Sequence, residues 1–180
     1  MKLLCLISIL AALAAAQTQK LPADVDPQSL SRLPLLKREG LSPELLKIFD
    51  FVAGSKDRPL PMGPQATSMY SPGVAEPIHG LNQYLRNTVI GPQAFQICTL
   101  IAAREYDENY EWAAHERAAK NVKVDQKTID AIKFNRDLND LPEKDALMIR
   151  FGRGLFREHK VSPELYAKVV DVFGKQGMIE

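Results

Sequence analysis

The chain has 180 residues, of which 46% are hydrophobic, 25% charged and 7% aromatic, a composition that suits one globular core. Its 23 Lys and Arg residues and 22 Asp and Glu residues give a net charge of +1. Because the sequence has no basic stripe that would neutralise a phosphate backbone, the charge pattern argues against nucleic acid as a partner.

Residues 1–16 have the pattern of a secretory signal peptide. Lys2 precedes a short apolar stretch, and small residues stand at Ala14 and Ala16. The stretch is shorter than the roughly 20 apolar residues that span a bilayer. We therefore expect a mature chain of residues 17–180, secreted or in the lumen of the secretory pathway, with no membrane contact after cleavage. An uncleaved interfacial anchor is the alternative.

Cysteine usage supports no internal disulfide in the mature chain. Cys5 lies in the predicted signal peptide, which leaves Cys98 as the single cysteine of residues 17–180. The neighbours of Cys98 are apolar, a setting that favours burial of the thiol in the core. Pairing with a cysteine of another chain is the alternative.

Signals for helix starts and ends recur along the chain. Ser-Pro-Glu at 42–44 and at 162–164 combines a capping hydroxyl, a proline at the first helical position and an acidic residue in the first turn. The helices that begin there are expected to end at Gly54 and Gly174. Residues 56–73 are rich in proline and glycine, which predicts a surface loop.

The spacing of apolar residues predicts further helices. No stretch alternates with period two over enough residues to build a sheet. The sequence therefore predicts an all-α domain of six to eight helices over residues 17–180. The additional helices are expected at 72–86, 92–104 and 107–121, after Asp125, and after Pro142 with an apolar stripe that continues to Phe156.

One face of the predicted helix 107–121 carries groups that can move a proton. Glu108, Glu111 and His115 fall at positions i, i+3 and i+7. A carboxylate within hydrogen-bond reach of an imidazole tunes its pKa and fixes its tautomer, as a general acid or base requires. Two alternatives are solvated glutamates beside a structural histidine, and a metal site built from the same three side chains.

The segment YEWAAHERAAKNVKVDQKTIDAI, from Tyr110 to Ile132, resembles the central helix pair of the carboxymuconolactone decarboxylase-like family. A weaker resemblance extends from Leu33 to Glu180. It implies the helical domain that this family shares with alkylhydroperoxidase D, and a small-molecule substrate. Since family members are commonly oligomeric, it also implies a homo-oligomer.

The chain departs from the peroxidase branch of that fold, whose motif is Glu-x11-Cys-x2-Cys-x3-His. His115 matches the family histidine, while Glu108 and Glu111 stand in place of the two redox cysteines. Gln96 stands in place of the relay glutamate. A carboxylate forms neither a disulfide nor a sulfenic acid, so thiol peroxidase chemistry at these positions is excluded.

The resemblance implies instead a cofactor-independent lyase or isomerase that acts on a small carboxylated or lactone-type substrate. His115 would transfer the proton, with Glu111 and Glu108 as the other catalytic candidates. Arginines could hold a substrate carboxylate bidentately. The substrate-binding candidates are Arg104, Arg117 and Gln96, and no metal is expected.

The predicted signal peptide shifts the expected pathway. Ring-cleavage catabolism is normally cytoplasmic, so a decarboxylation, isomerisation or cyclisation that tailors a natural product suits the compartment better. The alternative is a non-catalytic small-molecule binding protein that retains the fold. Gln96 in place of the relay glutamate favours this alternative.

Overall fold

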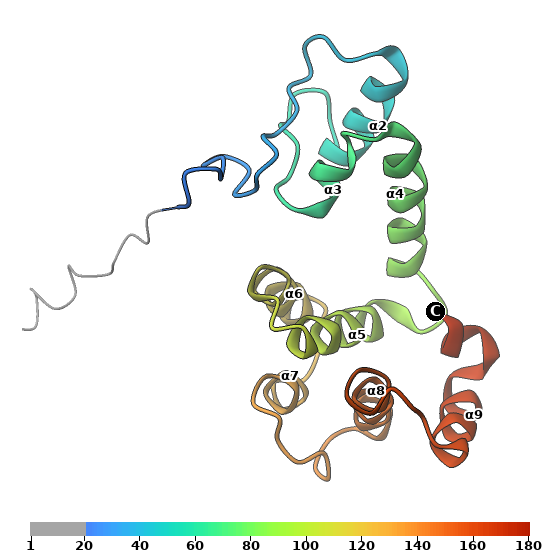
Figure 1. The fold of residues 1–180 in the computed structure, drawn as a ribbon. Helices are drawn as coiled ribbons and strands as arrows, with labels where there is room; N and C mark the ends of the chain where they lie inside the picture. The colour runs from blue at the N-terminus through green and yellow to red at the C-terminus, as the bar shows by residue number, and fades with distance from the viewer. Residues whose placement is uncertain (1–20) are drawn as a thin grey trace, which may run out of the picture. The chain divides into compact units, whose positions relative to one another are not determined.

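The computed structural model of the chain describes residues 21–180 (Figure 1). The predicted signal peptide and Cys5 lie outside these residues. All regular secondary structure within the described residues is helical, with eight α-helices, one π-helical turn and no strand. The predicted all-α class with six to eight helices is confirmed. Among the described helices, none has the length and apolar character needed to cross a membrane.

The helices begin and end close to the predicted positions. One exception is α3, a short helix inside the segment that was predicted to be a loop. In chain order the elements are α2 (Pro43–Ala53), α3 (Pro64–Ser68), α4 (Pro72–Arg86), α5 (Gly91–Glu105), α6 (Asn109–Asn121), α7 (Gln126–Lys133), α8 (Glu143–Arg153), the π-helical turn η1 (Gly154–Glu158) and α9 (Pro163–Ile179).

The predicted caps explain two of these starts. The Oγ atoms of Ser42 and Ser162 accept hydrogen bonds from the backbone N–H groups of Leu45 and Leu165, at 3.3 and 3.2 Å. Gly54 ends α2 in the left-handed conformation (φ 77°). Gly174 (φ 72°) interrupts α9 with a non-helical backbone, so the helix that begins at Pro163 ends there as predicted. The chain then resumes helical structure up to Ile179, which was not predicted.

The described helices group into two compact units, residues 21–79 and residues 80–180. In the first unit, α2 and α3 enclose a core that includes Phe49 and Met69. The single domain predicted over residues 17–180 stays a prediction.

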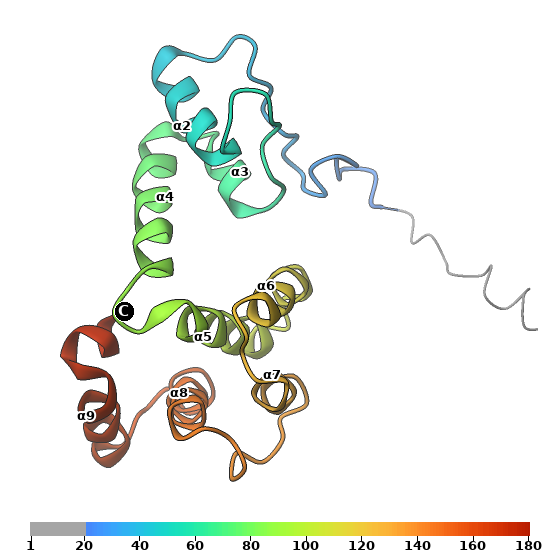
Figure 2. The ribbon, with the colours of Figure 1, turned by 180° about the vertical axis from the view of Figure 1, so that it is seen from behind.

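The second unit is built around α5, which packs against α6, α7 and α8 (Figure 2). Its core includes Leu100 on α5 and Ile129 on α7, both fully buried. α8 approaches α5 closely at Gly152, where an added Cβ would lie 2.6 Å from Cγ2 of Ile101. This close approach packs α8 tightly against α5, and α5 and α6 carry the predicted site residues.

Candidate functional site

His115 lies on α6 with its imidazole against α5. Its Nδ1 atom is 2.7 Å from Oε1 of Gln96, which is buried on α5. Its Nε2 atom is 3.3 Å from Oε2 of Glu111, one turn earlier on α6. The side chain of His115 is 13% exposed and that of Glu111 is 30% exposed. The structure therefore brings together three of the predicted site residues, which we call the His115 cluster.

The hydrogen-bond partners define where a proton sits in the His115 cluster. An amide oxygen only accepts, so with the Gln96 amide in this orientation Nδ1 of His115 carries a hydrogen and donates it. The carboxylate of Glu111 is also an acceptor, so Nε2 and Oε2 hold one proton between them or repel each other. This arrangement suits an imidazole–carboxylate couple that takes up or delivers one proton.

The environment lowers the pKa of His115. Burial is the largest cause, because it disfavours the imidazolium ion. The carboxylate of Glu111 acts in the opposite direction, and the positive charge of Arg86 lowers the pKa further. The imidazole is therefore mostly neutral at neutral pH, which is the state of a general base.

Two residues beside the His115 cluster were missed from the sequence. The ring of Phe95 lies 6.2 Å from the imidazole of His115, measured between ring centroids. The guanidinium carbon of Arg86, the last residue of α4, lies 4.8 Å from the centre of the Phe95 ring. Only tertiary packing brings Arg86 here, because 29 positions separate it from His115 in the sequence.

Some N–H donors of the Arg86 guanidinium have no partner within residues 21–180. Its Nε donates to Oδ1 of Asn82 at 2.7 Å, one turn earlier on α4. Within residues 21–180 no carboxylate forms an ion pair with it. A half-buried guanidinium that has no carboxylate partner within the described residues is suited to bind an anionic group near His115.

Glu108 does not share the helical face of Glu111 and His115, and that expectation is wrong. α6 begins at Asn109, one residue after Glu108, so Glu108 is the N-cap of this helix. The Glu108 carboxylate accepts the backbone N–H of Tyr110 at 3.0 Å and is exposed. The sequence pattern could not separate an acidic first-turn residue from a cap, because both are typical of helix starts.

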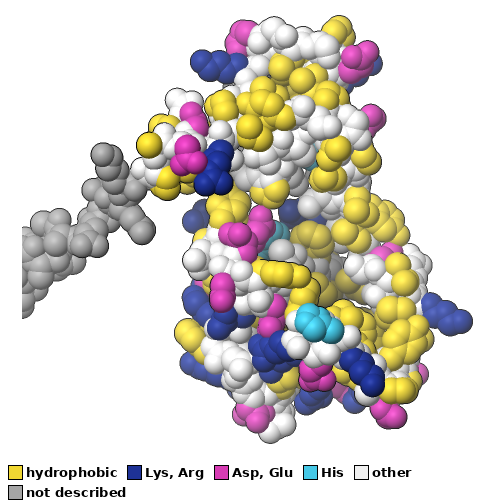
Figure 3. All heavy atoms as spheres, viewed as in Figure 1, with side chains coloured by type: hydrophobic (Ala, Val, Ile, Leu, Met, Phe, Trp, Pro, Cys, Tyr) yellow, Lys and Arg dark blue, Asp and Glu magenta, His cyan; other side chains and the backbone are white. Residues whose placement is uncertain are grey.

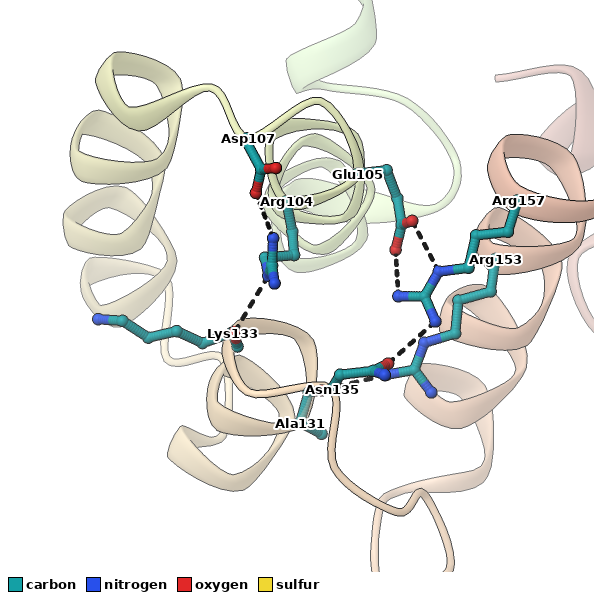
Figure 4. A network of polar contacts seen from close by, with 8 residues as sticks. All are labelled: Arg104, Glu105, Asp107, Ala131, Lys133, Asn135, Arg153 and Arg157. Atoms are coloured by element: carbon teal, nitrogen blue, oxygen red, sulfur yellow. Dashed lines mark hydrogen bonds and ion pairs between the residues drawn. The ribbon is translucent and has the colours of Figure 1, made fainter.

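Arg104 is bound in a different place. Its Nε donates to the backbone oxygen of Lys133 at 3.1 Å, and its Nη1 pairs with Asp107 (Figure 4). It lines a pocket of about 280 Å³ together with Glu108 and Trp112, a pocket to which His115 does not contribute. Arg104 therefore fastens the end of α5 to the end of α7.

Arg117 is exposed on α6, and no ion pair or hydrogen bond of its side chain forms within the described part of the chain. Within residues 21–180, no hydrogen bond or ion pair joins Arg117 to the His115 cluster. Of the three predicted substrate-binding residues, only Gln96 belongs to the cluster.

A neighbouring polar network joins helices and is structural (Figure 4). Arg157 makes two hydrogen bonds of 2.7 and 2.6 Å to the carboxylate of Glu105, and a third to Asn135 at 3.0 Å. Arg153 donates to the backbone oxygen of Ala131 at 3.1 Å. These contacts connect α5, α7, α8 and η1 and hold the scaffold of α5 in place.

Two further expectations concern Cys98 and a metal site. The thiol of Cys98 is accessible on α5, so the predicted burial in the core is wrong. Glu108, Glu111 and His115 do not converge on one point, and among residues 21–180 no three acidic, histidine or cysteine side chains form a metal-binding group.

Comparisons of the chain with protein-family models, with curated proteins and with solved structures find no match. The resemblance to the carboxymuconolactone decarboxylase-like family stays a prediction from the sequence motif.

Proposed function

We propose that this chain is a cofactor-independent lyase or isomerase that acts on a small carboxylated or lactone-type substrate. The observation that supports it best is the His115 cluster, in which Gln96 positions a half-buried imidazole at Nδ1 and the Glu111 carboxylate lies 3.3 Å from Nε2. A fixed imidazole with a lowered pKa and a carboxylate partner is suited to take a proton from a substrate carbon or oxygen and return it.

The residues of the His115 cluster and Arg86 beside it each have a proposed role in this proton transfer. Glu111 shares the proton with Nε2 of His115 and steadies the imidazolium that forms during transfer. Gln96 positions the ring through Nδ1. Arg86 replaces Arg104 and Arg117 as the group that attracts the substrate carboxylate, because it is the arginine whose charge acts on His115. Loss of CO2 or a shift of a double bond leaves an enolate-like charge that a neighbouring cation stabilises.

The setting that suits this chemistry best is the tailoring of a natural product in the secretory pathway. The support is the leader-like sequence of residues 1–16 together with the absence of redox cysteines at positions 108 and 111. Homo-oligomerisation belongs to the same proposal, on the family resemblance. A partner subunit would then be a second copy of this chain.

A comparison of small molecules tests the catalytic proposal. Metabolites of the native organism are measured by mass spectrometry with the wild-type gene, without it, and with alleles encoding His115→Ala or His159→Asn. His159 is exposed and lies outside the His115 cluster, so His159→Asn is the matched control. A compound one CO2 heavier than the lost product identifies a decarboxylase, and an isomeric pair identifies an isomerase or cyclase.

The second candidate is a binding protein that retains the fold. The neutral amide of Gln96, where a relay would need an acid, favours it. If the His115→Ala allele leaves all metabolites as in the wild type, the catalytic proposal is wrong. A His115→Ala protein that still retains the same small molecule as the wild type on purification would then support the binding role.

A further inference from the structure

A half-open apolar groove lies in the second unit, between α5, α8, η1 and α9. Its volume is about 230 Å³. Apolar walls come from each of the four elements, and neither His115 nor Glu111 lines the groove. The walls include Ile101, Phe151, Leu155, Phe156, Val169 and Phe173. Figure 3 shows that apolar side chains also reach the surface over α9.

The size of the groove limits what can occupy it. An α-helix with its side chains is about 10–12 Å across and needs a longer trough than this volume provides. An apolar cavity of about 150 Å³ holds a benzene ring, whereas drug-sized ligands use pockets from about 300 Å³ upward. A volume of 230 Å³ thus accommodates one ring with a few further atoms.

The charge at the groove also limits which ligands can bind there. Among the described residues, Glu180 is the single charged side chain that lines it. One of its carboxylate oxygens accepts hydrogen bonds from the Tyr84 hydroxyl at 2.6 Å and from the Gln176 amide at 2.8 Å. These bonds lower the pKa of Glu180 and keep it ionised. An anion at the rim repels a carboxylated ligand.

The second carboxylate oxygen of Glu180 is held less tightly than the first, and the hydroxyl of Thr88 also acts on this carboxylate and lowers its pKa. The bond of that second oxygen to the backbone N–H of Val89 is 3.3 Å long, and a carboxylate oxygen accepts two hydrogen bonds. A ligand hydroxyl at the rim would replace the hydroxyl of Thr88 as a donor to this carboxylate, while the ring of the ligand replaces water on the apolar walls.

We propose that this groove binds a neutral, single-ring molecule that carries one hydroxyl group, with the ring among the apolar side chains and the hydroxyl on Glu180. The site is separate from the His115 cluster and does not depend on the proposed function. The neutral ligand of the groove also differs in charge from the anionic substrate that we propose for the His115 cluster.

Cys98 provides a direct readout, because its thiol lines the groove and is accessible to solvent. The surrounding apolar groups raise its pKa to about 11, so alkylation is measured at mildly alkaline pH. The full chain with Cys5→Ser is labelled with a maleimide in the presence of p-cresol or benzoate. At a p-cresol concentration about ten times its Kd, we expect labelling to slow about tenfold, and benzoate to have no such effect.

A cavity-filling variant tests the same site by calorimetry. Cys98→Leu places a larger apolar side chain in the groove and should abolish the heat of p-cresol binding. Ala113→Leu adds volume at an exposed position of α6 and is the matched control, which should bind as the wild type does. If Cys98→Leu does not fold, the labelling experiment still decides, because it uses the unfilled groove.

Three results would overturn the proposal. The first is no protection by p-cresol, and the second is equal protection by benzoate, which would remove the role of Glu180. The third is protection of Cys98 that rises with protein concentration without any ligand, since this assigns the groove to a second copy of the chain.

Discussion

Nδ1 of His115 lies 2.7 Å from the side-chain oxygen of Gln96, so a neutral amide holds the imidazole where a charged partner would make it more basic. Burial then determines the net effect, and the pKa of His115 is lowered. The amide fixes the orientation of the ring without stabilising the imidazolium ion. The identity of residue 96 is therefore a means of setting the proton affinity of the His115 cluster.

The substitution Gln96→Glu should raise the pKa of His115. A second carboxylate next to Nδ1 stabilises the charged ring, and an opposite charge at this distance changes a pKa by about 1–3. The titration of the imidazole C–H resonances by NMR measures the change. Gln126→Glu, at an exposed position of α7, adds the same charge elsewhere and should leave the value as in the wild type.

Arg86→Gln should also raise the pKa of His115, because the positive charge of Arg86 lowers it in the wild type. The readout is again the NMR titration, and it needs no substrate. Arg117→Gln removes an equal charge from an exposed position of α6 and serves as the control. An unchanged titration in Arg86→Gln would show that this arginine does not act on the His115 cluster.

Glu116 forms a compact ion-pair group on α6, and its removal should destabilise the fold. Its carboxylate accepts from Lys120, Lys133 and the indole of Trp112, and these bonds lower its pKa to about 2. The stabilisation is complete above about pH 4.5 and is lost as pH falls towards about 2. We expect Glu116→Gln to lower the free energy of unfolding at neutral pH by about 1–2 kcal/mol.

Urea denaturation at neutral and acidic pH measures this effect. The control is Glu143→Gln, since Glu143 is 71% exposed in its ion pair with Lys168 and should contribute little. Equal losses for the two variants would contradict the special role of Glu116.

Gly152→Ala should weaken the packing of α8 on α5. The added methyl group would lie 2.6 Å from a side-chain carbon of Ile101, and overpacking of this kind costs about 1–3 kcal/mol. Gly80→Ala, at a helical position with nothing within 4 Å, should instead stabilise by about 0.5–1 kcal/mol. Thermal unfolding of the two variants should shift in opposite directions, and a shift in the same direction would refute this account.

His79 should make the first unit sensitive to acid. Its side chain is 3% exposed and its Nε2 has no hydrogen-bond partner. Burial lowers its pKa, while a hydrogen bond to the backbone of Gln65 acts in the opposite direction. Below about pH 6.5 the unfolded chain takes up a proton that folded His79 excludes, so the free energy of unfolding falls as pH decreases.

The pH dependence of unfolding between about pH 7 and about pH 5 measures the effect. His79→Leu should flatten this dependence, whereas His159→Asn, a change at an exposed histidine, should not alter it. A slope that stays the same in His79→Leu would exclude His79 as the source.

Helix boundaries were predictable because the caps are local. Ser42, Ser162 and Gly54 act on their own neighbours, so short patterns identify them. The turn after Gly174 was missed because its position depends on the approach of Gly177 to Ile90, which is distant in the sequence.

The sequence likewise showed only the local part of the His115 cluster. The spacing of Glu111 and His115 on one helix was visible, and the resemblance placed Gln96 near them. Arg86 and Phe95 depend on the packing around α5, and no spacing rule identifies them. The sequence did not show that Arg104 binds the backbone oxygen of Lys133, because an arginine at a helix end suits a substrate or a backbone oxygen equally well.

The hydrogen bond between Tyr84 and Glu180 joins residues 96 positions apart. Contacts of such long sequence separation cost loop-closure entropy before they stabilise the chain. This hydrogen bond joins the last residue of the chain to α4, next to the residues of α9 that line the apolar groove. The wall that α9 gives to the groove therefore depends on a residue that lies far from it in the sequence.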